Sequence, residues 1–572
     1  MLDSEKRIKE KVIEIYTVII YLLSVITFEI GFCNTSLIQN IISGKDIHYN
    51  FSICRILIYI VIFVIYFIFK KSFVEKAKEV SKNKAKRVII YLSIAAIIIS
   101  ILFVILVASI KPELLRALVI GLMAVFLGSI FLVYVSNDIT KNVIITLSTF
   151  GIIFTFATNY NHAIDEKRHF MSAFNISFLN FDYAQNPITD KQVEALPQLS
   201  KYTTIDEFLT KRYIPEITNE VNKEDLPSLP ANYSAILYMP AALGITIARF
   251  LGGSIIDMYI LGRIFNLIAY GILICIALKL LPYKKNIFAI IFLMPMMILL
   301  AGTYSIDGIC MGLISIFIAY CLKIYKENDT ISLKQFLILL LLFMITLLAK
   351  HMAYISIALI VFMLPLKNTI KKNKKYIPIM IIIALIVLVV GIFILLKILG
   401  LNLGTDSRGS GHINSSEQIK FLVNNPISLI ILLINHIKDT LLNFNWYVLL
   451  HQQVFFTNSA NCVMFIMLPY ILYVSITEDD YNFKIKDKII MILTFFATFI
   501  ITSFPLYLSF TQVGALHIAG YQTRYILPIL PLILLSLSNN KLKCEAKENR
   551  NMSISIVSGI FIFVGLLQLI IV

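Results

Sequence analysis

The sequence predicts an all-α integral membrane protein, on the evidence of its composition and of its long apolar runs. Of 572 residues, 58% are hydrophobic and 15% are charged, and the mean hydropathy is +0.84. Soluble domains carry about 25% charged residues. The apolar runs are continuous in Ile, Leu, Val and Phe, and many reach the roughly 20 residues with which a helix crosses a hydrocarbon core. A β-barrel would need short alternating strands, so helices are expected to carry every crossing.

About 15 crossings are expected, with a large extracytoplasmic loop after the fifth. The apolar run at 233–251 is not counted among them. Treating it as a crossing would put the basic segment LPYKK at 281–285 outside, so it is expected to lie on the outer surface as a juxtamembrane helix. The expected crossings cover residues 12–33, 53–70, 88–111, 113–136, 142–159, 255–280, 286–303, 307–325, 332–349, 351–367, 376–400, 460–477, 488–511, 522–539 and 551–572.

Clusters of Lys and Arg fix the expected orientation. The segment from Lys70 to Arg87 holds eight Lys or Arg against two Glu, and the segment from Leu366 to Lys375 holds five Lys and no acid. Positive charge in short loops marks the cytoplasmic side, which also puts the N-terminus in the cytoplasm of a multi-pass plasma-membrane protein. The net charge of +16 is therefore explained by topology, and no nucleic-acid partner is expected.

The charge bias reverses after the fifth crossing. Residues 160–232 carry eleven acids against seven Lys or Arg, as expected for an outer domain. The expected organisation has three parts. They are a four-helix module at 1–141, a core at 142–540 with an outer loop at 160–254 and an outer segment at 401–459, and a basic loop with the last helix at 541–572.

The acidic pair after the fifth crossing is the first candidate for chemistry, because ionisable residues close to a span are costly unless they have a function. If this segment is helical, Asp165 and His169 share a face and Glu166 points elsewhere. A carboxylate beside a membrane-bound donor suits a general base that takes a proton from an acceptor hydroxyl. The alternative is an acidic pair at a helix start beside a solvated histidine.

Cations at the expected outer helix ends suggest an anionic, lipid-anchored ligand. Arg524, Lys350 and Arg263 are candidates for holding the phosphate of a polyprenyl carrier, because Arg binds phosphate through two N–H groups and Lys through a point charge. The alternative is that each side chain merely reaches for lipid headgroups from its helix end.

The sequence gives little support for a metal or redox cofactor. Its seven cysteines stand singly, without a CxxC pair or a Cys/His cluster. A divalent metal at the Asp/Glu–His group stays open, although one such pair supplies too few ligands to predict a site. The sole tryptophan, Trp446, lies in the outer segment and is either an interfacial anchor or a ring that stacks on sugar.

Six short fragments in a fixed order carry a family resemblance. The chain resembles the bacterial polytopic family called domain of unknown function 2142, which is similar in layout to GT-C glycosyltransferases, over roughly Phe150 to Ser538. The first four helices lie outside the resemblance and look like an added module. The fragments are Asp165-Glu-Lys-Arg-His169, Tyr233-Ser-Ala-Ile-Leu-Tyr238-Met-Pro-Ala-Ala-Leu-Gly244, Gly262-Arg-Ile-Phe-Asn266, Ser305-Ile-Asp307, Lys350-His-Met-Ala-Tyr354 and Gln522-Thr-Arg-Tyr-Ile-Leu-Pro528.

The resemblance implies a GT-C-like bundle and a glycosyltransferase that moves a sugar from a polyprenyl-phosphate donor to a glycan or glycopolymer acceptor. In such enzymes an acid in the first large outer loop is the base, which puts Asp165 first and Glu166 second, with His169 beside them. The family often has Pro before the acidic pair, where this chain has Ile164. The expected substrate-binding residues are Arg168, Tyr233, Tyr238, Arg263, Asn266, Ser305, Asp307, Lys350, Tyr354, Gln522, Arg524 and Tyr525.

Two other functions are compatible with the sequence. A transporter or flippase of lipid-linked saccharides would also have many helices, but transporters usually carry internal repeats, and none is evident here. A polymerase or ligase of surface polysaccharide is close to the transferase in chemistry.

Overall fold

The computed structural model describes rather more than half of the chain. The described residues are 18, 22, 25, 56–57, 59–61, 63–64, 67–68, 131, 134–158, 160–161, 163, 165–180, 196, 233–327, 329–348, 353–372, 378, 412–442, 461–478, 480–539, 542 and 550–571. The expected crossings at 88–111 and 376–400 fall almost wholly outside these residues, as do large parts of the first, second and fourth.

All regular structure in the described residues is helical, and no strand occurs among them. Four of these helices are long and apolar enough to cross a bilayer, namely 139–156, 255–280, 307–327 and 485–509. A fifth would be added if the bent pair at 415–441 were one span. The protein is therefore a helical multi-pass membrane protein, while the count of about 15 crossings stays a prediction.

The chain divides into two compact units, each described here by itself. The first comprises Met1–Gly271, Met297–Ile306 and Glu548–Val572, and the second comprises Ile272–Met296 and Asp307–Lys547.

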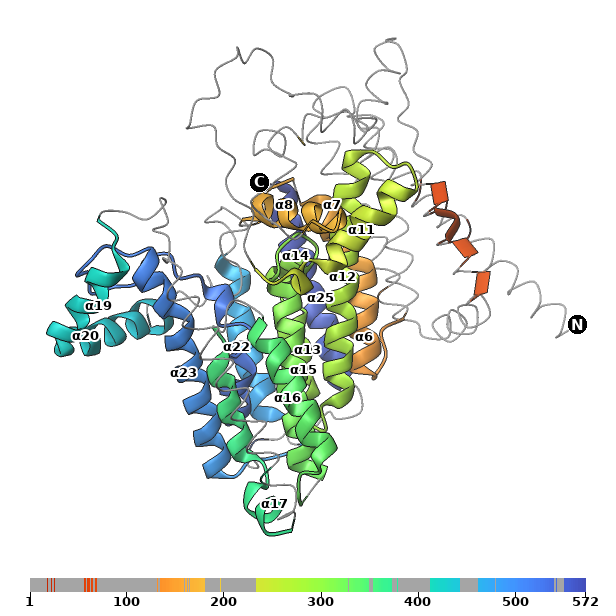
Figure 1. Cartoon of the computed structure of the whole chain (residues 1–572). Coiled ribbons are helices and arrows are strands. Elements are labelled where there is room, and N and C mark those ends of the chain that lie inside the picture. Colours follow the sequence, from red (N-terminus) through yellow and green to blue (C-terminus); the bar gives the residue numbers. More distant parts are fainter. Residues whose placement is uncertain are drawn as a thin grey trace, which may run out of the picture. The chain divides into compact units, whose positions relative to one another are not determined.

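The first unit is organised around the expected fifth crossing, which contains a π-helical turn in its middle. Asn142 on this crossing donates to the hydroxyl of Ser555 at 2.8 Å and so ties it to the last helix. The short helix after the crossing packs along the next apolar helix, and Arg249 donates to the carbonyl of Ser177 at 2.7 Å. The elements, labelled in Figure 1, are α6 (Ile139–Thr146), η2 (Leu147–Gly151), α7 (Ile152–Ala157), α8 (Glu166–Ser177), η5 (Ala235–Leu237), α11 (Met239–Phe250), the first part of α12 (Ile255–Leu280) and α25 (Arg550–Ile571).

The second unit packs around α23 (Ile485–Ser509), which contacts η6 and α24. A hydroxyl pair joins two of these elements, with Ser356 donating to Thr498 at 2.8 Å. The other elements are α13 (Lys285–Phe292), α15 (Asp307–Glu327), α16 (Leu333–Leu348), η6 (Ile355–Met363), α17 (Leu366–Lys372), α19 (Ser415–Asn424), α20 (Pro426–Ile437), η7 (Lys438–Leu442), α22 (Asn461–Thr477), η9 (Thr523–Tyr525) and α24 (Leu530–Ser536).

Three runs expected as single helices are interrupted. The run at 286–303 consists of α13 and α14 (Pro295–Ala301), because Pro295 lacks an amide hydrogen and cannot continue α13. In the run at 351–367, the described residues form the 3₁₀-helix η6, which ends before Pro365, and the run at 522–539 forms only η9 and α24 around two prolines. Prolines in apolar runs are the common cause.

One further expectation was wrong in detail. The surface helix expected at 233–251 begins as α11 at Met239, with Pro240 in its first turn, after the 3₁₀ turn η5. No helix was predicted for the outer segment at 401–459, and its described residues contain α19 and α20.

Candidate functional site

The acidic segment in the first unit forms the start of α8. Asp165 precedes the helix in the left-handed region, with φ 58° and ψ 13°, and its carbonyl accepts the amide of His169 at 3.1 Å. Left-handed backbone is costly for residues other than glycine, and Asp is among those that tolerate it best. This turn makes Asp165 half-buried and Glu166 fully buried, so the two neighbouring acids lie in different surroundings.

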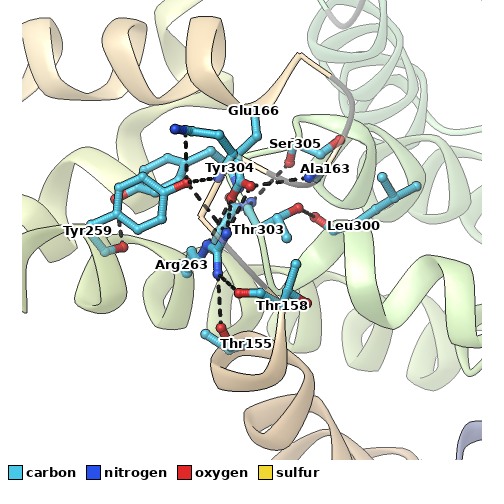
Figure 2. Close-up of polar contacts among 12 residues, drawn as sticks. Thr155, Thr158, Ala163, Glu166, Tyr259, Arg263, Leu300, Thr303, Tyr304 and Ser305 are labelled. Carbon is cyan, nitrogen blue, oxygen red and sulfur yellow. Dashed lines mark hydrogen bonds and ion pairs between the residues drawn. The ribbon is translucent and has the colours of Figure 1, made fainter. Parts of the chain in front are cut away.

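Glu166 forms a two-point ion pair with Arg263 of α12 (Figure 2). The Nε and Nη2 atoms of Arg263 each donate to a different carboxylate oxygen at 2.8 Å. The side chain of Arg263 is 1% exposed and that of Glu166 is 0% exposed. The backbone amides of Ala163 and Tyr304 add contacts of 3.3 Å to the same carboxylate. Both oxygens of Glu166 are thus occupied by fixed donors.

The rest of the Arg263 guanidinium closes the end of α7. Its Nη1 donates to the carbonyls of Thr155 and Thr158 at 3.1 and 2.8 Å, and its Nη2 lies 3.5 Å from the hydroxyl of Tyr259. The last carbonyls of a helix lack partners within the helix and attract positive charge, while the start of a helix attracts negative charge. Arg263 at the end of α7 and Glu166 at the start of α8 therefore join the two helices, and all five N–H donors of Arg263 are engaged.

Aromatic rings exclude water from this ion pair. The ring of Tyr259 lies below the Arg263 guanidinium at 4.8 Å, and the rings of Phe170 and Tyr304 lie 4.8 and 4.9 Å from that of Tyr259. Tyr304 donates its hydroxyl to the carbonyl of Tyr259 at 2.9 Å. Burial raises the pKa of Tyr304 well above its usual value of 10, so the phenol stays a donor.

The motif Gly262-Arg263-Ile-Phe-Asn266 has a structural explanation at each polar or small position. A side chain at Gly262 would place its Cβ 2.1 Å from the hydroxyl of Tyr304. One turn further along α12, Asn266 donates to the carbonyls of Thr303 and Ser305 at 2.7 and 3.0 Å. The motif thus fixes the turn 302–306 against α12, and Ser305 enters the site through its backbone.

His169 lies one turn into α8 and is 4% exposed. Its Nδ1 is 2.9 Å from the hydroxyl of Tyr238, and its ring lies 5.9 Å from that of Tyr233. Arg168 on the same helix is half-buried. The structure therefore brings His169, Tyr233 and Tyr238 together as expected, through residues about 65 positions apart.

The second unit holds a second buried ion pair, between Asp307 at the start of α15 and Arg524 of η9. Their closest atoms, Nη1 and Oδ2, are 3.1 Å apart, and the side chains are 8% and 4% exposed. The Arg524 guanidinium lies 5.6 Å from the ring centre of Tyr525. Tyr354 donates to the carbonyl of Tyr525 at 3.1 Å, and Gln522 accepts the Tyr525 amide through its carbonyl at 3.1 Å.

The remaining expectations fall outside these two clusters. Lys350 and Trp446 lie outside the described residues. Among the described residues, no group of three His, Cys, Asp or Glu side chains could hold a metal ion.

A comparison with known protein families shows which family this chain belongs to. The family model described as predicted membrane protein (DUF2142) matches residues 148–533, about two thirds of the chain. The chain belongs to this family. No curated protein and no solved structure matches it. The match contains both ion pairs and begins inside the expected fifth crossing, in agreement with the resemblance seen in the sequence.

Sequence reasoning missed several residues of this DUF2142 chain. Tyr259 and Tyr304 enclose the first ion pair. Two more rings extend the aromatic cluster beside Arg524: the ring of Tyr521 lies 5.5 Å from that of Tyr525, and the ring of His436 lies 4.8 Å from that of Tyr521. One signal was available, because Tyr259 stands four residues before Arg263 on the same helix and so shares its face. His436 lies in a segment that was given no helix.

Proposed function

We propose that the chain is a membrane glycosyltransferase that transfers a sugar from a polyprenyl-phosphate donor to a cell-envelope glycan on the extracytoplasmic face. Asp165 is the general base in this proposal. The observation that carries it is the difference between the two acids at the start of α8. Fixed donors occupy both oxygens of Glu166, while the side chain of Asp165 is half-buried and keeps access to solvent.

The positions of the neighbouring side chains support a base at Asp165. Asp165 precedes a helix whose first residue, Glu166, is held by Arg263, so its backbone is fixed from one side. A base held in one position transfers a proton more efficiently than a mobile one, because the geometry need not be found in each reaction. His169, held by Tyr238, lies one turn further along α8 and can orient an acceptor hydroxyl.

In this proposal Arg524 binds the phosphate of the donor, and Lys350 is a second cation for it. All donors of Arg263 are engaged inside the first unit, so Arg263 is given the role of holding Glu166. The Arg524 guanidinium suits a phosphate, because its planar N–H groups match two phosphate oxygens.

The proposed reaction is a single displacement with inversion at the anomeric carbon. Asp165 takes the proton of the acceptor hydroxyl, and the acceptor oxygen forms a bond to the anomeric carbon. The bond from that carbon to the phosphate oxygen breaks, and polyprenyl phosphate leaves as an anion. Arg524 stabilises the negative charge that develops on the leaving phosphate.

Transfer of radiolabelled sugar from a polyprenyl-phosphate donor in proteoliposomes tests the proposal. Asp165→Asn should reduce transfer by about 100-fold or more, the scale of a lost general base, while donor binding persists. Arg524→Gln should weaken donor binding as well as transfer. Full transfer by Asp165→Asn would rule out Asp165 as the base.

Asp138→Asn is the matched control for this experiment. Asp138 caps α6 in the same unit by accepting the amides of Thr140 and Lys141, and Asn caps helices as well as Asp does. The control should therefore retain both transfer and insertion into the membrane.

One observation favours a second candidate, a flippase of lipid-linked saccharides. The break between α13 and α14 leaves a discontinuous helix among buried apolar residues, and discontinuous helices are typical of transporters. Movement of the labelled lipid across the bilayer without covalent transfer would favour this function over the transferase.

A further inference from the structure

The α19–α20 pair in the second unit exposes an apolar stripe. On α20, Ile427, Ile430 and Ile434 are 71%, 59% and 59% exposed, and on α19 Val423 is 73% exposed. The spacing i, i+3, i+7 puts the α20 residues on one face. The opposite face carries Leu432 and His436, which are buried. α20 thus carries apolar residues on both faces, but only one of these faces packs on the protein among the described residues.

The geometry of the pair does not fit a crossing. The axes of 415–424 and 426–441 differ by 109°, at the point where Pro426 prevents α19 from continuing. At 1.5 Å per residue the two arms are about 15 and 24 Å long, shorter than a hydrocarbon core of about 30 Å.

Both ends of the pair are tied to one short stretch of chain, residues 508–516, which comprises the end of α23 and the turn that follows it. At the beginning of the pair, Ser415 donates to the carbonyl of Leu508, and Gln418 accepts the amide of Gly514 at 2.8 Å. Near the end of the pair, Asn435 donates to the carbonyl of Leu516 at 2.9 Å. A helix that crossed the bilayer would have its ends about 30 Å apart, so both ends lie on the same side of the membrane.

The surface next to the stripe indicates what covers it. The pair packs on the end of α23 through Leu432, Tyr507 and Leu508. α23 is long and apolar enough to cross, and Ile501 and Phe504 in its last turns, next to this packing contact, are exposed apolar side chains of the kind that face acyl chains in a membrane protein. The polar residues flanking the stripe, among them exposed Lys420 and Lys438 beside the exposed acids Glu417 and Asp439, suit the headgroup region at its two ends.

We propose that the α19–α20 pair lies within one leaflet of the bilayer, with its apolar stripe against acyl chains and both ends on the side of residues 508–516. The proposal is independent of the glycosyltransferase proposal. It gives a defined depth to the segment that leads into η9, because His436 of α20 contacts the ring of Tyr521 at 4.8 Å, three residues before Arg524.

The single tryptophan of the chain makes the depth of the stripe measurable. In a Trp446→Phe background, Ile430→Trp puts the only fluorescent indole on the stripe. The full-length protein is reconstituted in vesicles of phosphatidylcholine and phosphatidylglycerol with a spin label at acyl position 5 or 12. Leu493→Trp on α23 is the matched reference, because Leu493 and Ile430 are both 59% exposed.

Ile430→Trp should be quenched at least twofold more by the label at position 5 than by that at position 12, and Leu493→Trp should show the reverse order. Stronger quenching of Ile430→Trp by the label at position 12 than by that at position 5 would mean that α20 crosses the bilayer and would overturn the proposal. The absence of quenching by either label would mean that water or a second protein covers the stripe, which would also overturn it. Ile434→Trp, equally exposed one turn further, repeats the measurement should the first variant fail to fold.

Discussion

The two buried ion pairs in the described part of this protein each join a carboxylate to an arginine, but in different ways. In the first unit, Glu166 and Arg263 are joined at two points, and Arg263 also caps the last carbonyls of α7. In the second unit, Asp307 and Arg524 approach through Nη1 and Oδ2 at 3.1 Å, at a helix start and in a 3₁₀ turn. The first pair is part of the framework that fixes α7, α8 and α12 to one another.

A charged residue in a membrane protein can hold the fold together or bind a ligand, and the two pairs differ in which role their geometry suits. A buried ion pair needs every polar atom satisfied, because an isolated charge in an apolar interior is very costly. The first pair meets this requirement within the protein, which leaves Arg263 no N–H donor for a ligand. The charge of Arg524 is paired in a less regular stretch of chain, where exchange of Asp307 for a phosphate would disturb fewer helices.

The largest expected effect tests the framework role of the first pair. Glu166→Gln leaves the Arg263 charge buried without its counter-ion, and we expect a loss of about 3–5 kcal/mol in the free energy of unfolding. Denaturant titration of the purified protein in detergent measures it. The exposed acid Asp138 provides the reference, since Asp138→Asn should change stability by less than about 0.5 kcal/mol. Equal free energies of unfolding for Glu166→Gln and Asp138→Asn would show that the Glu166–Arg263 pair does not stabilise the fold.

The long helices could be predicted from the sequence because composition alone specifies them. The run expected at 255–280 is α12, with the same bounds, and the runs at 307–325 and 332–349 agree with α15 and α16 to within two residues. The breaks were missed because hydropathy does not distinguish a continuous helix from two short ones around Pro295. The α19–α20 pair was missed because its two arms are each too short to register as a crossing.

The members of the candidate site were found more readily than their partners. Glu166, Arg263, Asp307 and Arg524 stood out as charges in an apolar chain, yet their pairing depends on contacts between residues 97 and 217 positions apart. The expectation that Asp165 and His169 share a helix face applied to a continuous helix, whereas Asp165 precedes α8 in left-handed backbone. Which of Asp165 and Glu166 would be buried followed from the left-handed turn at Asp165, and the sequence carries no signal for that turn.

A smaller loss is expected when the second pair is broken. Asp307→Asn removes the negative charge that lies 3.1 Å from Nη1 of Arg524 in a single-point ion pair, and we expect a loss below the about 3–5 kcal/mol of the two-point pair. The same denaturant titration gives the value, and farnesyl phosphate should then recover part of the lost stability by supplying a negative charge to Arg524. A loss as large as that of Glu166→Gln, without recovery, would show that the two pairs have the same framework role.

The contact between α12 and the turn 302–306 sharpens the description of the first unit. Gly262→Ala places a Cβ 2.1 Å from the Tyr304 hydroxyl, and crowding in a packed interior costs about 1–3 kcal/mol. Removing that hydroxyl in Gly262→Ala/Tyr304→Phe should recover part of the loss. Additive losses in the double variant would contradict a direct clash, and the double-mutant cycle in detergent decides between the two.

The smallest effect compares one buried tyrosine from each unit. Tyr304→Phe removes the hydrogen bond to the carbonyl of Tyr259 and should cost about 0.5–1.5 kcal/mol. Tyr283 is 3% exposed, and its hydroxyl has no hydrogen-bond partner among the residues that the structure describes. Tyr283→Phe should therefore leave stability unchanged or raise it by up to about 1 kcal/mol, because a buried unsatisfied polar group is removed while the stacking on Tyr481 at 4.2 Å persists. Paired unfolding curves of the two variants measure the difference, and a larger loss for Tyr283→Phe would place the tighter polar network in the second unit.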